Sequence, residues 1–437
     1  MKTLRIGGGA GFSGDRIEPA VDLARDGDLR YLVFECLAER TIALAQLAKK
    51  QGRSAGYDPM LRARMEAVLP ACKRNGTRII TNMGAANPEA AARETLSIAS
   101  RLGLAGLRVG WITGDDVLLL MGSIASADPR EQLVSANAYL GIEPILACLL
   151  EGADVILTGR VADPSLFLAP MVHEFNWRLD DWPLLGKGTA IGHLLECAGQ
   201  LTGGYFADPG LKDVQGLDRL GFPIAEVDEN GDAVLTKLAG SGGALSIRSC
   251  KEQILYEVQD PSRYLTPDVT ADFSTIQFEE EEQQDRVRVR GASGTERPEM
   301  LKVSTGFSAG FIAEGQISYA GPGALARAEL ARAILAKRLG WIKSGDFRMD
   351  FIGVDSMHGS ALSDPLQHPY EVRLRVAGRL FAEGDARRLM HEVESLYVNG
   401  PAGGAGVATG LRESIAMDAA FIPREAIKTR VELEVAR

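Results

Sequence analysis

The chain has 437 residues, of which 46% are hydrophobic and 24% charged, a globular composition that excludes wholesale disorder and a fibrous repeat. Its formal net charge of −10 repels phosphate backbones and no stripe of lysine or arginine offsets that charge, so we expect no nucleic-acid partner. At about 150 residues per domain, this length predicts two or three domains.

The most apolar uncharged run, residues 117–127, is much shorter than the roughly 18 apolar residues that cross a bilayer. The N-terminal residues carry no apolar core of a signal peptide. The five cysteines are odd in number and lack C-x-x-C spacing, which is typical of reduced, buried thiols and argues against disulfides or a zinc site. We therefore expect a soluble cytoplasmic protein without a membrane partner.

The first half of the chain alternates short apolar runs with amphipathic segments. Strands are predicted at residues 4–6, 31–34, 78–80, 107–112 and 155–157. Helices are predicted at residues 19–25, 41–50, 58–69, 88–102 and 143–151, and Pro70 is expected to end or kink the third of them. Apolar strands separated by helices predict an α/β fold, a parallel sheet with helices on both faces.

From about residue 222 the pattern changes to hairpins. Residues 224–235 predict two strands around an Asn-Gly turn, and residues 273–278 and 286–290 predict a second hairpin. A helix at 324–339 and strands at 347–353 and 372–376 follow. We therefore predict an α/β domain at residues 1–212 that carries the site, followed at residues 213–437 by an α+β domain with mixed or antiparallel strands.

Three glycines after the first strand, Gly9, Gly11 and Gly14, match the G-x-G-x-x-G fingerprint of a dinucleotide cofactor site, with Glu35 at 21 positions beyond Gly14. Pro19 argues against that interpretation, because the fingerprint's helix would hold this proline in its interior at a cost of ~3 kcal/mol. We expect Pro19 in the first turn of a helix instead. No cofactor is assigned.

Polar side chains follow the carboxyl end of each predicted parallel strand, where open sheets bind their ligands. The candidate acids and bases are Asp15, Glu35 and Asp115. The candidate substrate-binding residues are Ser13, Arg16, Asn82, Arg160 and Asp163. Two arginines can hold a carboxylate by paired hydrogen bonds, and crowded carboxyls can separate their pKa values for acid and base roles. Gly403 and Gly404 are expected to close over this site from the second domain.

Structural roles compete for several of these residues. Asp163 stands before Pro164 and is a good helix N-cap, and Asp15 can simply pair with Arg16. Clustered carboxylates can hold Mg²⁺ or Ca²⁺, but no metal ligand is assigned. Among the five histidines no H-E-x-x-H pair occurs. His358, just after a strand, is the first candidate among them for a function, but an ordinary surface or core role is the preferred interpretation.

Several stretches, read together, resemble the acyclic terpene utilisation AtuA-like family: residues 11–16, 158–170, 194–204, 264–268 and 399–406. The resemblance covers nearly the whole chain. It implies a bacterial catabolic protein that works beside enzymes degrading branched acids as acyl-CoA thioesters, for which a lyase or hydratase step is the usual proposal. Longer relatives carry a small C-terminal domain, so we expect a separate small partner subunit here.

We therefore predict an enzyme for a small anionic substrate, a carboxylic acid or its acyl-CoA thioester, with CoA as substrate carrier. The predicted reaction is that of a lyase, a hydratase or C–C lyase that uses paired carboxylates and an arginine clamp. Two alternatives stay open, a non-catalytic acyl-CoA-binding subunit of a multi-protein degradative enzyme and an NAD-linked oxidoreductase. A homo-oligomer is expected.

Overall fold

The computed structural model describes residues 2–122, 126–342, 346–359 and 369–437. The chain divides into two compact units. The first unit comprises Met1–Gly122, Ser135–Thr305 and Asp418–Arg437, and the second comprises Ser123–Val134 and Gly306–Met417. The boundary expected between residues 212 and 213 does not coincide with these units, because the strand Pro223–Asp228 beyond it pairs with the first strand of the chain.

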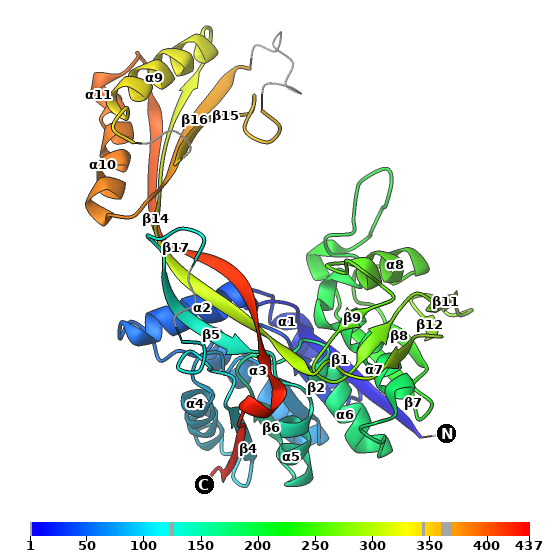
Figure 1. The fold of residues 1–437 in the computed structure, drawn as a ribbon. Coiled ribbons are helices and arrows are strands. Elements are labelled where there is room, and N and C mark those ends of the chain that lie inside the picture. The colour runs from blue at the N-terminus through cyan, green and yellow to red at the C-terminus, as the bar shows by residue number, and fades with distance from the viewer. Residues whose placement is uncertain (1, 123–125, 343–345, 360–368) are drawn as a thin grey trace. The chain divides into compact units, whose positions relative to one another are not determined.

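Within the described residues, the first unit is built on a ten-stranded mixed sheet in the order β11-β12-β8-β7-β1-β2-β3-β6-β4-β18 (Figure 1). Its parallel centre consists of β1 (Thr3–Ala10), β2 (Tyr31–Phe34), β3 (Arg78–Thr81), β6 (Val155–Leu157) and β4 (Arg108–Thr113). Antiparallel strands extend it, namely β7 (Pro223–Asp228), β8 (Ala233–Lys237), β11 (Gln277–Glu280), β12 (Val287–Arg290) and β18 (Arg430–Val435). The predicted α/β fold and the first predicted hairpin are confirmed. The second hairpin also forms, but its first strand is Gln277–Glu280 instead of residues 273–278.

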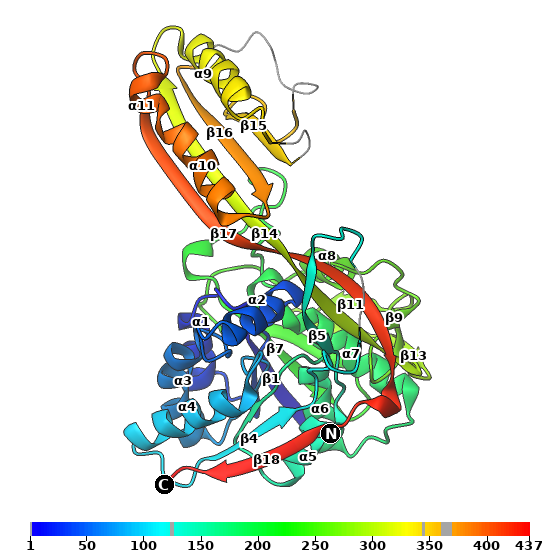
Figure 2. The same ribbon diagram turned by 60° about the vertical axis from the view of Figure 1, so that its left-hand side comes forward.

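Helices cover both faces of this sheet (Figure 2). On one face lie α1 (Glu18–Asp26), α3 (Leu61–Asn75) and α4 (Pro88–Arg101). On the other lie α5 (Glu143–Leu150), α6 (Ser165–Phe175) and α7 (Trp182–Glu196). Alternation along β2 explains the two layers, since Leu32 and Phe34 pack in the first core and Tyr31 and Val33 in the second.

Of the two outcomes expected at Pro70, the end of the helix is wrong, since α3 continues to Asn75. The residues after the proline, Ala71 and Cys72, are buried, so packing holds the last turn in place despite the missing N–H group. The remaining elements of the first unit include α2 (Glu39–Lys50), α8 (Ile247–Leu255), and a small sheet of β9 (Tyr264–Leu265), β10 (Thr270–Asp272) and β13 (Ser293–Thr295).

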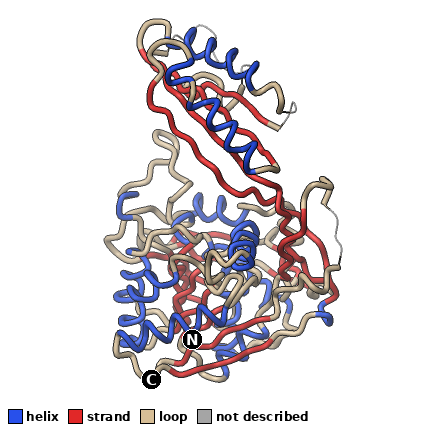
Figure 3. The backbone as a smooth tube through the Cα atoms, turned by 90° about the vertical axis from the view of Figure 1, so that its left-hand side faces the viewer, coloured by secondary structure: helices blue, strands red, loops and turns tan. Residues whose placement is uncertain are grey.

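A second sheet has the order β15-β16-β14-β17 and consists of β15 (Phe347–Ile352), β16 (Glu371–Leu380), β14 (Met300–Ala320) and β17 (Ala405–Pro423). Most of this sheet belongs to the second unit, whereas the start of β14 and the end of β17 belong to the first. Off this path, β5 (Gln132–Ala138) pairs with β14. The helices α9 (Ala324–Arg338) and α10 (Glu383–Glu394) pack on the sheet through a shared apolar core, and α11 (Leu396–Asn399) follows (Figure 3). None of the described helices combines the length and apolarity that crossing a membrane requires.

Candidate active site

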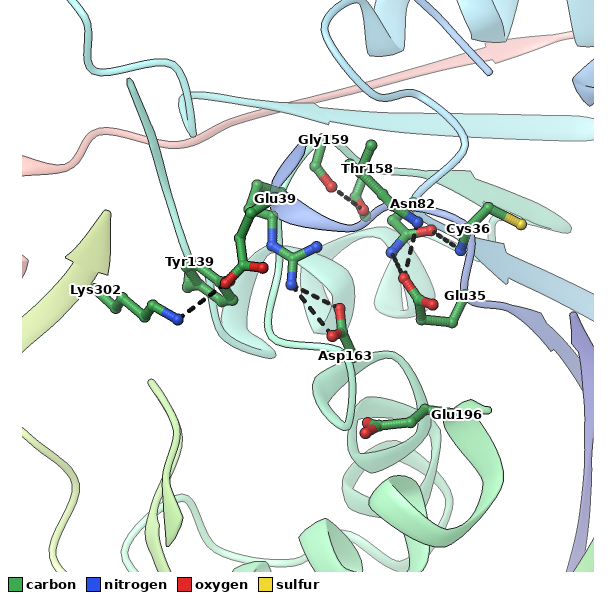
Figure 4. A network of polar contacts seen from close by, with 12 residues as sticks. Glu35, Cys36, Glu39, Asn82, Tyr139, Thr158, Gly159, Asp163, Glu196 and Lys302 are labelled. Carbon is green, nitrogen blue, oxygen red and sulfur yellow. Dashed lines mark hydrogen bonds and ion pairs between the residues drawn. The ribbon is translucent and has the colours of Figure 1, made fainter. Parts of the chain in front are cut away.

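A cavity of about 690 Å³ lies in the first unit beyond the carboxyl ends of β2 and β6. Its polar wall includes Glu35, Glu39, Tyr139, Arg160, Asp163, His193, Glu196 and Lys302. Its apolar wall includes Leu265, Pro267, Pro298, Met300, Leu301 and Phe421. Figure 4 shows the side chains of Glu35, Asp163 and Glu196 around one space. The cavity therefore combines a polar, carboxyl-rich region with an apolar one.

Three pieces of the chain supply the central groups of this cavity. Glu35 is the first residue after β2, and Arg160 and Asp163 lie in the turn between β6 and α6. His193 and Glu196 lie in the last turn of α7, three positions apart and hence on one face of the helix. The parallel strands end at the same edge of the sheet, which brings the first two pieces together as the sequence predicted for Glu35, Arg160 and Asp163.

Arg160 is 2% exposed and its guanidinium bonds the Asp163 carboxylate. Its Nη2 lies 2.9 and 3.2 Å from the two Asp163 oxygens, and its Cζ lies 4.2 Å from the centre of the Tyr139 ring. Burial alone would lower the pKa of Arg160, but the nearby Asp163, Tyr139 and Glu35 raise it, so the group is a cation. Among the described residues, Nε and Nη1 find no hydrogen-bond acceptor. Two donors of a buried cation thus have no partner in this part of the chain.

The predicted N-cap role of Asp163 is wrong. The helix α6 has Pro164 at its N-cap position without a side-chain cap, and the Asp163 carboxylate is used by Arg160 instead. Burial raises the pKa of Asp163 even though Arg160 opposes that effect.

Glu35 is a buried carboxyl held in place by the main chain and by Asn82. Its Oε1 accepts hydrogen bonds from the Leu37 N–H at 2.8 Å and from Asn82 Nδ2 at 2.9 Å. The Asn82 side chain is fixed in turn, because its Oδ1 accepts from the Cys36 N–H at 2.7 Å (Figure 4). Burial, and then the charge of Asp163, raise the pKa of Glu35 to about 8. At neutral pH Glu35 is therefore a carboxylic acid that can donate a proton.

Glu39 on the opposite part of the wall stays anionic. It accepts hydrogen bonds from Tyr139 Oη at 2.6 Å and from Lys302 Nζ at 3.0 Å. Burial opposes its ionisation, but these two donors outweigh burial and lower the pKa of Glu39 to about 2. Glu39 thus orients Tyr139 and Lys302 and is a poor group for proton transfer at neutral pH.

His193 and Glu196 form a buried pair that was not selected from the sequence. His193 Nδ1 lies 2.7 Å from Glu196 Oε1, and the rings of Tyr264 and Phe273 lie 5.2 and 5.7 Å from the imidazole. Burial lowers the pKa of His193 to about 4 and raises that of Glu196 well above its ordinary value. The available signal was the His-x-x-Glu spacing, which the apolar helix around it obscured.

The other predicted acids and the second arginine have structural roles. The Asp15 carboxylate accepts from the main-chain N–H groups of Gly11 and Arg16, which closes the loop after β1. Arg16 is exposed, bonds the Asp218 carbonyl, and lines a smaller cavity of about 390 Å³. The expected clamp of Arg16 with Arg160 is therefore not formed, because the two arginines line different cavities.

Asp115 and Ser13 lie outside the lining of the main cavity. The Asp115 carboxylate accepts from the Arg160 N–H at 2.8 Å and from Asn137 Nδ2 at 2.9 Å, so it fixes the turn that carries Arg160. Burial raises the pKa of Asp115 to about 6. The Ser13 carbonyl accepts from the buried Arg64, and the Ser13 hydroxyl bonds Asp58.

The glycines predicted for a cofactor are explained by packing within the chain. Gly9 is part of β1, where a Cβ atom would lie 2.7 Å from the Phe34 ring, and a Cβ at Gly11 would lie 2.5 Å from the Cys197 main chain. A Cβ at Gly14 would meet the ring of Phe12 at 2.7 Å. The helix that follows begins at Glu18 with Pro19 in its first turn, as predicted.

Gly403 and Gly404 belong to the second unit, as does His358. The two glycines lie in the turn before β17, and a Cβ at Gly404 would lie 2.9 Å from Ile317 of β14. His358 is exposed in the turn after β15. In the part of the chain that the structure describes, no three His, Cys, Asp or Glu side chains are grouped so that they could hold a metal ion.

Comparison with protein-family models gives a match to the family described as Acyclic terpene utilisation family protein AtuA, over residues 4–433. Neither the curated proteins nor the solved structures contain a match to the chain.

Proposed function

The chain belongs to the acyclic terpene utilisation family AtuA, and from this premise we propose that it is a catabolic enzyme for a small carboxylic acid or its acyl-CoA thioester. The proposed reaction is that of a lyase, which adds or removes water or cleaves a carbon–carbon bond next to a carbonyl group. The observation that carries the proposal is the buried Arg160, with two donors that have no partner among the described residues, beside the carboxyl of Glu35.

Arg160 is the proposed anchor for the substrate's carboxylate or thioester carbonyl. A buried donor without a partner costs ~1–3 kcal/mol, so an acceptor that enters the cavity gains the bonds that the empty site lacks. The guanidinium also stabilises the negative charge that develops on the carbonyl oxygen when a neighbouring C–H bond breaks. Asp163 holds the guanidinium in place through two of its contacts.

Glu35 is the proposed general acid. It is protonated at neutral pH, and the N–H groups of Asn82 and Leu37 fix its Oε1. In a lyase step the leaving group takes up a proton as its bond to carbon breaks, and a positioned carboxylic acid supplies that proton. The apolar wall of Leu265, Met300 and Phe421 suits a branched aliphatic chain, and the cavity volume lies within the usual range of ~300–1,000 Å³ for small-molecule sites.

The test uses the purified chain with branched 3-hydroxy acids and their CoA thioesters, and measures loss of water or chain cleavage by mass spectrometry. We expect turnover, a kcat lowered about 10²- to 10⁴-fold in Glu35→Gln, and a raised KM in Arg160→Lys. Glu66→Gln, an exposed carboxyl of α3, is the matched control and should match the parent protein. Binding of a thioester without turnover would refute the enzyme and favour the acyl-CoA-binding subunit.

A further inference from the structure

A second cavity, of about 390 Å³, lies next to the candidate active site in the first unit. Three residues, Gly11, Cys197 and Tyr256, line both cavities, so the two share a wall. The other residues that line the second cavity come from the loop after β1 and from residues 199–222. Neither Arg160 nor Glu35 lines it, so the proposed function leaves this cavity without a role.

The shared wall lies beside the proposed general acid. The Glu35 N–H donates to the carbonyl of Ala10 at 3.2 Å, and Gly11 is the next residue of the chain. Gly11 also lies against the residue that ends α7, since a Cβ on it would lie 2.5 Å from the Cys197 main chain. The second cavity therefore begins at the end of the candidate active site where Glu35 stands.

The apolar end of the candidate active site lies on the other side of its centre. Met300 and Lys302 are two positions apart on β14 and hence on one face of that strand. Figure 4 shows Lys302 and Glu35 on opposite sides of Asp163, whose carboxylate bonds Arg160. The space around the proposed carbonyl anchor thus extends in two directions, toward apolar residues at one end and toward the second cavity at the other.

The lining of the second cavity mixes amide, apolar and aromatic groups. The side-chain amide of Gln200 can both donate and accept hydrogen bonds, and Leu220 and Phe222 are apolar. Two further rings of the lining are exposed, Phe12 at 60% and Tyr205 at 88%. Exposed apolar groups gathered at a cavity are typical of a ligand site. This lining suits a flexible chain in which amide groups alternate with apolar ones.

Arg16 is the one cation among the described residues that line the second cavity. Its Nη1 donates to the Asp218 carbonyl at 3.1 Å, and its Nε lies 3.5 Å from a Glu18 oxygen. Neither contact uses Nη2, and the side chain is 47% exposed. The Asp15 carboxylate also lines the cavity, but the main-chain N–H groups of Gly11 and Arg16 bind it. A phosphate that reaches this cavity therefore meets a guanidinium with a donor to spare.

We propose that the second cavity binds the phosphopantetheine arm of a thioester substrate, with the amides of the arm near Gln200 and its phosphate on Arg16. This inference rests on the proposed function and selects the thioester over the free acid. A free acid carries a chain on one side of its carbonyl carbon, whereas a thioester carries a second one through its sulfur. The two directions away from Arg160 match an acyl chain toward Met300 and an arm that passes Tyr256.

The binding test does not depend on turnover. CoA and a carrier protein loaded with phosphopantetheine are the two sources of this arm, and pantetheine is the arm without its phosphate. Isothermal titration calorimetry of the purified chain with each probe shows which source is bound. We expect CoA to bind more tightly than pantetheine, because its phosphate adds the contact with Arg16. Binding of the loaded carrier protein alone would assign the arm to that source, and no binding of any probe would overturn the proposal.

Matched variants place the bound arm in the second cavity. Arg16→Gln should weaken CoA binding about 10- to 100-fold and leave pantetheine binding unchanged, because only CoA carries the phosphate. Phe12→Ala should weaken both probes at least about threefold through lost apolar contact. The controls are Arg25→Gln, at an exposed arginine of α1, and Tyr397→Ala, at an exposed tyrosine of α11, and both should match the parent protein. CoA affinity that is unchanged in Arg16→Gln would overturn the assignment.

Turnover assays separate this inference from the proposed function. In Arg16→Gln we expect a raised KM for the CoA thioester, with kcat close to that of the parent protein, because Arg16 lies outside the candidate active site. Conversion of the free acid without conversion or binding of its thioester would refute the arm site and leave the enzyme standing. Binding of CoA through Arg16 without any turnover would refute the enzyme and leave the arm site standing.

Discussion

The pH dependence of stability gives the sharpest test of the environment of Glu35. The folded protein raises the pKa of this carboxyl from its ordinary 4.5 to about 8 through burial and the charge of Asp163. The folded state therefore holds a proton that the unfolded chain releases, and Glu35 lowers stability progressively as pH rises from about 4.5 to 8. Each pH unit in this window costs about 1.4 kcal/mol, so the full cost above pH 8 is ~3–5 kcal/mol.

Glu35→Gln removes the ionisation and keeps the shape. The amide oxygen still accepts from Asn82 and Leu37, so the variant should match the parent within ~1 kcal/mol at pH 4.5. At pH 8 it should be more stable by ~3–5 kcal/mol. Urea denaturation at several pH values measures the difference, with Glu66→Gln as the control whose difference stays constant. A flat difference between pH 5 and 8 would show that Glu35 is ionised in the folded protein.

Three further results follow from the same contacts. Affinity for an anionic ligand should fall as pH rises past 8, because Glu35 then carries a negative charge beside the ligand. The KM of Glu35→Gln should stay constant across that pH range. Arg64→Met should lower the free energy of unfolding by at least ~3 kcal/mol in urea denaturation, because the buried Arg64 binds three carbonyls of the loop after β1. The control Arg62→Met, at an exposed arginine, should lower it by under ~1 kcal/mol. Equal losses in the two variants would contradict this role of Arg64. Gly11→Ala should cost ~1–3 kcal/mol by the same measurement, because its Cβ would meet Cys197, and a neutral result would contradict the close approach.

The elements of the fold that carry a clear local hydrophobic pattern could be predicted from the sequence. The parallel strands are short, apolar and buried on both faces, so β2 and β6 stand out from the helices around them. By contrast, β14 and β17 are long strands with many small, polar or exposed residues, and no apolar run marks them. The hairpin of β7 and β8 was visible, but its pairing with β1 is a long-range contact that no local pattern encodes.

The candidate site could likewise be predicted only in part. Glu35, Asn82, Arg160 and Asp163 were predicted because the position of a residue after a parallel strand fixes its place at the sheet edge. Asp15 followed a strand equally closely, yet the main-chain N–H groups of its own loop take up its carboxylate. The sequence thus predicts which residues reach the sheet edge, while local hydrogen bonds decide which of them face the cavity.

The hidden pair in α7 has a physical explanation. A helix that is buried nearly all round needs apolar residues at most positions, so the pattern around His193 and Glu196 is that of a core helix. Burial of this kind lowers the pKa of His193 and raises that of Glu196, whereas an exposed histidine and glutamate at the same spacing would form an ordinary ion pair. Charge balance adds to this, because the cavity already holds Asp163 and Glu39 beside Arg160 and Lys302, and burial raises the pKa of both Glu35 and Glu196. The apolar sequence of α7 and the acid–base character of its last turn are therefore two consequences of the same burial.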